Sequence, residues 1–353
     1  MKALILSGGT GSRLRPLTYT NAKQLIPVAN KPILFYIIEK VVNSGITEIG
    51  IIVGDTCDEI KSTVGNGENW NANITYIYQP LPLGLAHAVK VASSFLCDSD
   101  FIMILGDNLF KMDLDILIET FYSTDSNACI LLHRVDNPQQ YGVAVVENGR
   151  IIKLVEKPTD FISDLAITGV YVFDKSIFPA IDRTKPSLRG ELEITDSIQE
   201  LLNIGGTLTF ELTRGWWKDT GKQRDLLEAN RLVLGDMECT IQSCHERSST
   251  ISGMVQTGKS VTIENSIIRG PAIIGDNAVI VDSYIGPYTA LGNSTVIRNC
   301  ELENSIVLAN STLDSIDKRV DGSLIGKNVT IKGKNSKPTS VSFLLGDNSE
   351  VCL

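Results

Sequence analysis

The sequence predicts an α/β domain followed by a parallel β-helix, and three observations support this fold class. The chain has 353 residues, enough for two domains at roughly 150 residues each. Up to about residue 235, short apolar runs alternate with amphipathic stretches, and from residue 255 an aliphatic residue recurs at every sixth position. We therefore expect one domain over residues 1–236 and a second over residues 237–353, each long enough to bury a core.

The first domain alternates predicted strands with predicted helices. Strands are expected at the apolar runs Ala3–Leu6, Ile49–Val53, Ile74–Tyr78, Phe101–Leu105 and Ala128–Leu132. Helices are expected over Pro32–Val42, Gly84–Leu96 and Arg224–Met237, where apolar residues recur at helical spacing. Strands that alternate with helices predict a mainly parallel sheet that is covered on both faces and binds ligands at the carboxyl ends of its strands.

The second domain carries a six-residue repeat. Its aliphatic positions are Val255, Val261, Ile267, Ile273, Val279, Ile285, Leu291 and Ile297. Small or turn-forming residues recur four positions later, at Pro271, Asn277, Ser283, Thr289 and Thr295. This is the hexapeptide repeat of a parallel β-helix, in which each of these aliphatic side chains is expected to point toward the coil axis. The phase slips near Glu301–Ile306, and Ile325–Ile331 resembles a further coil.

A phosphate-loop motif inside this repeat is expected to be a coincidence. Gly253–Ser260 fits the pattern GxxxxGK[ST] letter for letter. That pattern binds phosphate only between a strand and a helix, where loop amides and the helix N-terminus surround the anion. Here Val255 and Val261 are in phase with the hexads and the residues that follow favour a strand. We therefore expect no nucleotide site at Lys259.

The composition limits the partners. Acidic residues outnumber basic ones by 41 to 32, a formal charge of −9, so the chain lacks the cationic surface that nucleic acids and anionic membranes require. The apolar residues at the N-terminus are too few for a signal peptide, and no run approaches the roughly 20 apolar residues of a membrane span. Seven cysteines without a CxxC pair indicate neither a disulfide framework nor a zinc cluster. We expect a cytoplasmic protein with no nucleic-acid or membrane partner.

A glycine-rich turn follows the first predicted strand. Ser7–Arg13 holds three glycines in four positions, which let the backbone approach a ligand and turn its amides toward a phosphate. Leu14 stands where a dinucleotide-binding fingerprint requires its third glycine, so a nicotinamide or flavin site is disfavoured. Arg13, Arg15 and Lys23 lie close in sequence and favour an anionic ligand.

This turn opens an ordered series of short sequence blocks that carries a specific resemblance. The blocks are Leu6–Thr18, Ala22–Val28, Asn30–Pro32, Gln79–Pro80, Gly84–Ala86, Leu105–Asn108, Tyr141–Val143, Glu156–Pro158, Thr168–Tyr171, Arg189–Asp196 and Trp217–Gly221. Together they resemble the sugar-1-phosphate nucleotidylyltransferases, and most of all the long-form glucose-1-phosphate thymidylyltransferases with a C-terminal hexapeptide β-helix. The resemblance implies a Rossmann-like nucleotidyltransferase α/β/α sandwich followed by a left-handed parallel β-helix.

The resemblance also implies a reaction. A phosphate oxygen of glucose 1-phosphate attacks the α-phosphorus of dTTP in line with the leaving group, giving dTDP-glucose and pyrophosphate. No side-chain nucleophile is needed, so catalysis is expected to rest on positioning and charge neutralisation, with Mg²⁺ as the cofactor.

Three residues are implied to be catalytic: Arg13, Lys23 and Asp107. Arg13 and Lys23 would hold the triphosphate and stabilise the departing pyrophosphate. Asp107 follows the apolar run Phe101–Leu105, at the carboxyl end of a predicted strand, and with Asp219 it is implied to bind Mg²⁺. Judged alone, each aspartate would be interpreted as the cap of a turn or helix.

Two groups of binding residues are implied as well. The nucleotide-binding residues are Gly8, Gly9, Gly11, Ser12, Arg13, Gln24, Gln79 and Gly84. The sugar-phosphate-binding residues are Asn108, Gly142, Glu156, Lys157, Tyr171 and Arg189. The two glutamine amides can pair with the edge of thymine, but an amide does not sense the methyl group that separates thymine from uracil. A UTP-dependent or broad-specificity enzyme therefore stays an alternative.

Two further functions stay open. The β-helix also resembles that of bifunctional enzymes that acetylate an amino sugar phosphate with a histidine as general base, yet His87, His133 and His245 all precede residue 255. A non-catalytic assembly subunit that binds nucleotide sugars would be expected to lack one of the catalytic or metal residues, all of which are present. We expect the β-helix to mediate homo-oligomer formation, because stacked coils present flat faces.

Overall fold

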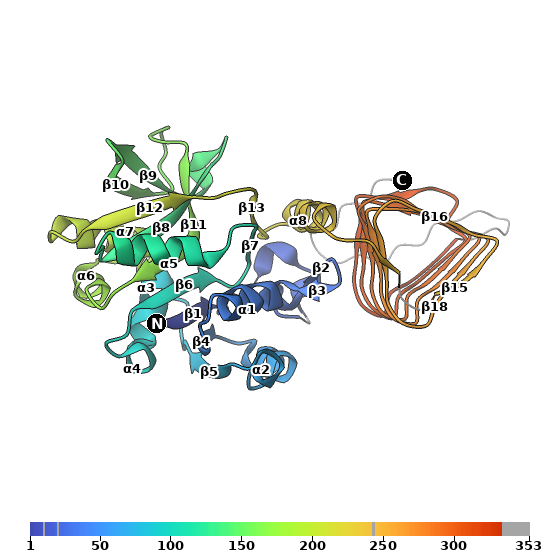
Figure 1. Cartoon of the computed structure of the whole chain (residues 1–353), viewed down its shortest axis with the longest axis horizontal. Coiled ribbons are helices and arrows are strands. Elements are labelled where there is room, and N and C mark those ends of the chain that lie inside the picture. The colour runs from blue at the N-terminus through green and yellow to red at the C-terminus, as the bar shows by residue number, and fades with distance from the viewer. Residues whose placement is uncertain (10, 20, 242–243, 334–353) are drawn as a thin grey trace. The chain divides into compact units, whose positions relative to one another are not determined.

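Two compact units make up the computed structural model, which describes residues 1–9, 11–19, 21–241 and 244–333 (Figure 1). The first unit is Met1–Val233 and the second is Leu234–Leu353. Within the described ranges no helix is long and apolar enough to cross a bilayer. The boundary between the two units falls near residue 236, where the sequence placed the end of the first domain. The assignment of a separate role to each domain stays a prediction.

Four neighbouring strands of the first unit run parallel. They are β1 (Lys2–Leu6), β4 (Glu48–Val53), β5 (Asn73–Tyr78) and β6 (Phe101–Leu105), in the spatial order β6-β1-β4-β5. Each coincides with an apolar run from which a strand was expected. Their carboxyl ends meet at one edge of the sheet, which is where ligands are expected to bind.

The rest of this nine-stranded sheet is mixed, which corrects the prediction of a mainly parallel sheet. β11 (Leu165–Phe173) is antiparallel to β6, to β8 (Ala128–Arg134) and to β9 (Gly142–Glu147). β10 (Arg150–Glu156) is antiparallel to β9, and β12 (Leu208–Leu212) is parallel to β8. A strand that is buried on both faces needs apolar residues whatever its direction, so an apolar run predicts a strand but not how it is oriented.

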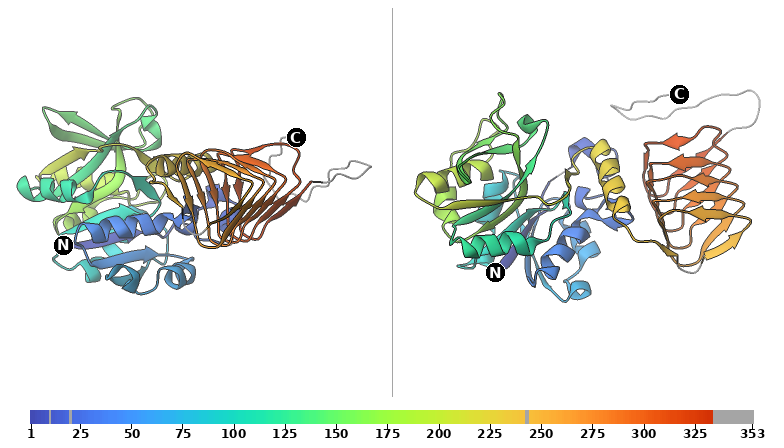
Figure 2. Two further views of the ribbon diagram at one scale, coloured as in Figure 1. Left: turned by 45° about the vertical axis from the view of Figure 1, so that its right-hand side comes forward. Right: turned by 45° about the horizontal axis from the view of Figure 1, so that its top comes forward.

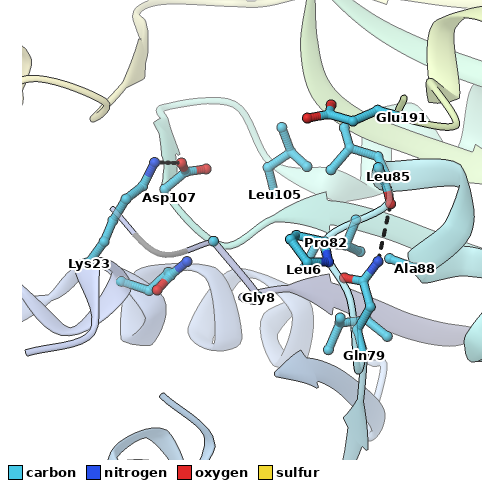
Figure 3. A pocket seen from close by; sticks show the side chains of 14 residues that line it. Leu6, Gly8, Lys23, Gln79, Pro82, Leu85, Ala88, Leu105, Asp107 and Glu191 are labelled. Atoms are coloured by element: carbon cyan, nitrogen blue, oxygen red, sulfur yellow. Dashed lines mark hydrogen bonds and ion pairs between the residues drawn. The ribbon is translucent and has the colours of Figure 1, made fainter. Parts of the chain in front are cut away.

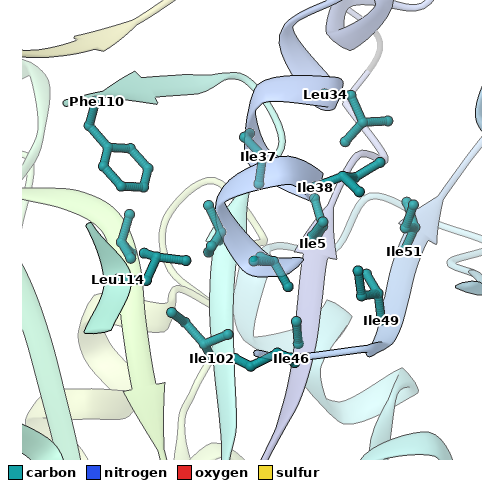
Figure 4. Packing of buried hydrophobic residues seen from close by; sticks show 14 of the residues in the cluster. Ile5, Leu34, Ile37, Ile38, Ile46, Ile49, Ile51, Ile102, Phe110 and Leu114 are labelled. Atoms are coloured by element: carbon teal, nitrogen blue, oxygen red, sulfur yellow. The ribbon is translucent and has the colours of Figure 1, made fainter. Parts of the chain in front are cut away.

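Helices cover both faces of the sheet (Figure 2). They are α1 (Ile33–Asn43), α2 (Cys57–Val64), α3 (Leu85–Val91), α4 (Ser93–Leu96), α5 (Leu114–Ser123), α6 (Ile177–Arg183), α7 (Ile194–Asn203) and α8 (Gln223–Gly235). Side chains of β1 alternate between two cores. Ala3 and Ile5 pack with α1, α2 and α5 (Figure 4), whereas Leu4 and Leu6 pack with α3, α4, α6 and α7. The helix expected over Gly84–Leu96 is divided in two, with Ala92 between α3 and α4.

Short elements complete the first unit. They are η1 (Ser12–Leu14), η2 (Leu17–Tyr19), η3 (Lys23–Leu25), η4 (Glu68–Trp70), η5 (Pro138–Gln140), β2 (Pro27–Val28), β3 (Lys31–Pro32), β7 (Asn108–Phe110) and β13 (Trp217–Asp219). β7 and β13 form an antiparallel ribbon in which Asp219 lies opposite Asn108. This ribbon brings Asp219 close to the end of β6, although the two segments are far apart in the sequence.

The second unit is a left-handed parallel β-helix made of three sheets (Figure 2). The first sheet holds β14 (Thr240–Ile241), β17 (Val255–Thr257), β20 (Ala272–Ile274), β23 (Thr289–Leu291), β26 (Ile306–Val307) and β29 (Leu324–Ile325). The second holds β15 (Cys244–Arg247), β18 (Val261–Glu264), β21 (Val279–Val281), β24 (Val296–Arg298), β27 (Thr312–Asp314) and β30 (Thr330–Lys332). The third holds β16 (Thr250–Ser252), β19 (Ile267–Arg269), β22 (Tyr284–Ile285), β25 (Glu301–Glu303) and β28 (Val320–Asp321).

The six-residue register expected for these coils holds in part: Val255, Val261, Ile285, Leu291 and Ile297 are fully buried, whereas Ile267, Ile273 and Val279 are not. Val255 pairs with Ala272 and Ala272 with Thr289, so one coil is 17 residues long and one of its three steps has five residues instead of six. Ile267 is consequently 45% exposed, whereas its neighbour Ile268 is fully buried. At Ile267, Ile273 and Val279, which are not buried, the next residue is buried instead: Ile268, Ile274 and Ile280. Aliphatic residues are often adjacent in this sequence. A series taken at every sixth position therefore stays aliphatic even where a 17-residue coil has shifted the buried position by one residue.

The phosphate-loop motif lies between two strands of this β-helix. β17 begins at Val255 and β18 at Val261, so the lysine of the motif lies in a turn between strands, and a strand follows it rather than a helix. The backbone amide of Lys259 donates to Oδ1 of Asp276 in the next coil at 2.7 Å. The strand–loop–helix arrangement that phosphate binding requires is therefore absent at this motif, and its loop makes contacts between coils instead.

Candidate active site

A cavity lies at the carboxyl ends of β1, β5 and β6 (Figure 3). Seven of the residues singled out in the sequence line it: Gly8, Gly9, Lys23, Gln24, Gln79, Gly84 and Asp107. They come from four separate segments of the chain. The parallel strands bring them together, because all the strand ends concerned lie at the same edge of the sheet.

The glycine-rich turn forms one wall of this cavity. Gly11 has a φ of 64°, and a Cβ added there would lie 2.8 Å from Cβ of Lys23, so a side chain at this position would push Lys23 away. Ser12 opens η1, and both Ser12 and Arg13 are exposed to solvent. The turn therefore presents backbone and cationic groups at the mouth of the cavity.

Lys23 and Asp107 form an ion pair at this mouth (Figure 3). Lys23 lies on η3 and Asp107 directly follows β6, and each side chain is less than 20% exposed. Burial by itself lowers the pKa of Lys23, but the Asp107 carboxylate outweighs that effect and the pKa is raised. Lys23 is consequently a fixed positive charge at neutral pH.

Asp219 is buried beside this pair. Burial, followed by repulsion from Asp107, raises the pKa of Asp219 to about 6, and Lys23 and Arg13 offset only part of the increase. The backbone N–H and Oγ1 of Thr220 both donate to the carbonyl oxygen of Asp107, at 3.2 and 2.7 Å, which ties the two carboxylate segments together. Two crowded carboxylates with excess negative charge are a donor set that suits a hard divalent cation.

A cation at this position would need oxygen ligands from the substrates as well. In the described part of the chain, no group of three or more His, Cys, Asp or Glu side chains is arranged to hold a metal ion. A pair of carboxylates completed by phosphate oxygens and water is the usual environment of Mg²⁺ in enzymes that act on nucleotides. The residues present therefore fit a divalent cation that binds together with a triphosphate.

Two glutamine amides also line the cavity. Gln24 is 2% exposed, and its Oε1 has no hydrogen-bond partner in the described structure. Nε2 of Gln79 donates to the carbonyl oxygen of Gly84 at 3.3 Å and lies 2.9 Å from Nδ1 of His87. Gly84 has a φ of 104°, and a Cβ there would lie 2.4 Å from the carbonyl oxygen of Leu192, so this position requires glycine. An unpaired amide oxygen in a cavity is a ready acceptor for a ligand N–H.

A second cluster forms around Glu156, at the end of β10. Its Oε2 accepts a hydrogen bond from Oγ1 of Thr195 at 2.7 Å, and its Oε1 lies 3.3 Å from Arg189 and 3.4 Å from Lys157. A Cβ on Gly142 would lie 2.7 Å from the same Oγ1 of Thr195, so glycine leaves room for the Glu156 carboxylate. The cluster joins four of the six residues implied to bind the sugar phosphate.

The remaining two residues of that group are buried. Asn108 is 2% exposed, and its Nδ2 donates to the carbonyl oxygen of Thr168, which also accepts from Nε1 of Trp217 at 3.1 Å. Tyr171 is 3% exposed and stacks against Phe173, and burial and then Glu156 raise its pKa. The structure places Tyr171 among core side chains, near Glu156 but outside the cavity of Figure 3, so a direct sugar contact stays a prediction.

Sequence reasoning missed several side chains of these two regions. Glu191 lines the cavity, Thr195 holds Glu156, and Glu193 is 4% exposed and receives Arg189 at 2.7 Å. All three belong to the block Arg189–Asp196, in which only Arg189 was assigned a role from the sequence. His87 directly follows another matched block and was considered only as a possible acetyltransfer base.

Comparisons with known proteins identify the family of the chain. The family profile described as Nucleotidyl transferase matches residues 2–235. A glucose-1-phosphate thymidylyltransferase from Streptomyces antibioticus is 47% identical over 353 residues, with 99% of each chain covered. Another from Streptomyces griseus is 42% identical and covers 99% of this chain and 98% of its own. A solved structure from Bacillus anthracis, provisionally named glucose-1-phosphate thymidylyltransferase, has a TM-score of 0.64 at 38% identity and covers 68% of this chain and 98% of its own.

The matched region and the two side-chain clusters coincide. The family profile spans the whole first unit, which contains the Lys23–Asp107 pair and the Glu156 cluster. The Streptomyces relatives extend the similarity through the β-helix, because they align over nearly the full chain. The chain therefore belongs to the nucleotidyl transferase family.

Proposed function

We propose that the protein transfers a thymidylyl group from dTTP to glucose 1-phosphate and releases pyrophosphate. One observation carries this proposal: Lys23, Asp107 and the glycine-rich turn line the same cavity as the amides of Gln24 and Gln79. Lys23, Asp107 and the glycine-rich turn suit a triphosphate with its cation, and the two amides suit the edge of a pyrimidine base. The names of the Streptomyces relatives support the choice of dTTP and glucose 1-phosphate.

The chain's own residues act by position and charge. A phosphate oxygen of glucose 1-phosphate forms a bond to the α-phosphorus, and the bond from that phosphorus to the bridging oxygen breaks, so pyrophosphate leaves with the electron pair. Lys23 and Arg13 neutralise charge on the phosphates as they separate. Glu156 accepts hydrogen bonds from sugar hydroxyls, and Lys157 and Arg189 beside it attract the sugar phosphate.

We propose Mg²⁺ as the cation held by Asp107 and Asp219. Bound there, it would neutralise phosphate charge and draw the carboxylates of the two segments together. Ionised Asp219 is unfavourable in the folded protein without such a cation, since burial and Asp107 raise its pKa to about 6. Asp107 and Asp219 would therefore act as ligands of the cation, and the cation would in turn stabilise the ionised form of Asp219.

A substrate panel tests this function. The five common nucleoside triphosphates are combined with glucose, galactose, mannose and N-acetylglucosamine 1-phosphates, and pyrophosphate release is measured with Mg²⁺ and with a chelator. We expect the highest kcat/KM with dTTP and glucose 1-phosphate, and no release with the chelator. Higher kcat/KM with UTP would move the assignment to the uridylyl enzymes. No release with any pair would favour the assembly-subunit interpretation.

We also propose that the protein works in the cytoplasm and that copies associate through the β-helix. The flat outer faces of the three sheets support self-association. Light scattering of the full chain, compared with a chain that ends after α8 and is first checked for folding by circular dichroism, tests this. Equal oligomeric states for the two chains would contradict it.

A further inference from the structure

A histidine without a part in the proposed reaction contacts Gln79, one of the residues that line the cavity. His87 is in the first turn of α3, and its Nδ1 is 2.9 Å from Nε2 of Gln79, which follows β5. The same Nε2 lies 3.3 Å from the carbonyl oxygen of Gly84, the residue before α3. The start of α3 therefore offers two partners to one atom of Gln79.

These two contacts decide which way the Gln79 amide faces. The carbonyl oxygen of Gly84 can only accept, so the amide atom that faces it is the nitrogen. Nδ1 of His87 faces the same nitrogen and must accept as well, which places the imidazole proton on Nε2. Both N–H groups of the amide are then used. The His87 contact is the shorter of the two and contributes more to the orientation.

The oxygen of the same amide is left for a ligand. Oε1 of Gln79 faces the glycine-rich turn and lies 3.3 Å from the place that a Cβ on Gly8 would occupy (Figure 3). Among the residues that the structure describes, no donor meets this oxygen. Toward the cavity, Gln79 therefore offers an acceptor and no donor.

We propose that His87 is a positioning residue that makes the cavity selective for bases with an N–H at the edge that Gln79 reads. Thymine and uracil carry such a donor at N3, whereas cytosine carries a lone pair there and would face the oxygen of Gln79 with repulsion. An amide free to rotate would accept cytosine as well, by turning its nitrogen inward. The inference rests on the proposed function, because it takes Gln79 as a nucleobase contact.

Two substitutions of nearly equal shape isolate the acceptor. His87→Leu removes it, and His87→Asn restores an acceptor near the position of Nδ1. kcat/KM is measured for dTTP, UTP and CTP with glucose 1-phosphate, together with the melting temperature. We expect His87→Leu to lower the preference for dTTP over CTP about tenfold, mainly by lowering KM for CTP, with KM for glucose 1-phosphate unchanged. His87→Asn keeps most of the preference.

Two results would overturn the role of His87. One is an unchanged preference in His87→Leu, and the other is an equal loss in both variants, which would mean that His87 acts only by filling space. Calorimetric binding of dTTP and CTP to the same three proteins, without sugar phosphate, separates this inference from the proposed reaction. If no nucleotide is turned over, the proposed reaction is wrong. The ratio of the binding constants for dTTP and CTP still decides whether His87 orients Gln79.

Discussion

The first unit holds a group of partly buried charges, whereas the polar side chains buried in the described coils of the β-helix are all hydroxyls. Lys23, Asp107 and Asp219 share one region of the first unit, and each is largely withdrawn from water. The polar side chains that are buried in the described coils are Thr257, Ser266, Ser283, Thr289, Thr295, Ser305 and Ser311. Several of these link neighbouring coils. Oγ of Ser266, for example, accepts the backbone N–H of Ser283 at 3.1 Å.

This difference between the two units indicates which side chains serve function and which serve stability. Buried charge with incomplete compensation lowers the free energy of unfolding, and it persists where a ligand supplies the missing partner. Buried aliphatic residues and paired hydroxyls contribute to stability and bind nothing. Substitutions in the charged region should therefore change activity at little or no cost in stability, and substitutions on the coil axis should do the opposite.

Asp107→Asn should show the largest effect. It removes a proposed cation ligand and the partner of Lys23 while keeping the shape of the side chain. We expect kcat/KM for pyrophosphate release to fall roughly a thousandfold for every substrate pair, with the fold retained by circular dichroism. Asp182→Asn, which disrupts only an exposed pair with Lys90, is the matched control and should leave the rate unchanged. Retained activity in Asp107→Asn would refute the proposed cation site.

Asp219→Asn should lose activity and gain stability. The pKa of Asp219 in the folded protein is about 6, above its ordinary value of 3.8. Well below pH 3.8 the carboxyl is protonated in both states. As pH rises from there through 6, the unfolded state ionises before the folded state, in which burial and Asp107 oppose the charge, so stability is lost. In chelator at pH 7, Asp219→Asn should therefore melt above the unmodified protein, by at most about 3 kcal/mol in free energy.

The same comparison at two further conditions checks the cause of that gain. The difference in melting temperature should become much smaller at pH 4, where the carboxyl is uncharged in the folded state and only about half ionised in the unfolded state. Added Mg²⁺ should stabilise the unmodified protein more than Asp219→Asn, because only the former keeps both carboxylates. A variant that melts below the unmodified protein in chelator at pH 7 would show that the charged region does not store unfavourable energy.

Ile268→Ala and Ile267→Ala test the β-helix side of the comparison. Ile268 is fully buried on the axis and should cost about 2–5 kcal/mol when truncated, whereas Ile267, 45% exposed, should cost less than about 1 kcal/mol. Calorimetric melting of the full chain measures both, and pyrophosphate release should be unchanged in each. If Ile267→Ala were the more destabilising, the strict six-residue register would be correct after all.

The same two residues show how far the sequence could predict the fold. Aliphatic periodicity indicated a β-helix correctly, but Ile267 and Ile268 are chemically alike, so only strand pairing reveals which of them faces the axis. In the first unit, apolar runs marked the strands but not their directions. Asn148 and Gly149, with φ of 50° and 75°, close the antiparallel β9–β10 hairpin and were the local signal that went unused.

The sequence could predict which residues belong to the site, but it could not predict which of their side chains contact one another. Asp107 at the end of an apolar run and Lys23 after a glycine-rich turn could be singled out by sequence position and resemblance. Their ion pair depends on the order of strands in space, which the sequence does not state. The contact between Gln79 and His87 spans a loop and the start of a helix, and it follows from the position of α3 against β5 rather than from any motif.

Lys259→Ala should show the smallest effect of all, and that makes it a sharp test of the comparison. Lys259 completes a perfect phosphate-loop pattern, yet it lies in a turn between β17 and β18, where its backbone amide donates to Asp276 of the next coil. That hydrogen bond uses the backbone, which alanine keeps. We expect unchanged kcat/KM and melting temperature, whereas Lys23→Ala, the matched lysine in the charged region, should lower kcat/KM at least a hundredfold. A comparable loss in Lys259→Ala would mean that the β-helix takes part in nucleotide binding and that the division between the two units does not hold.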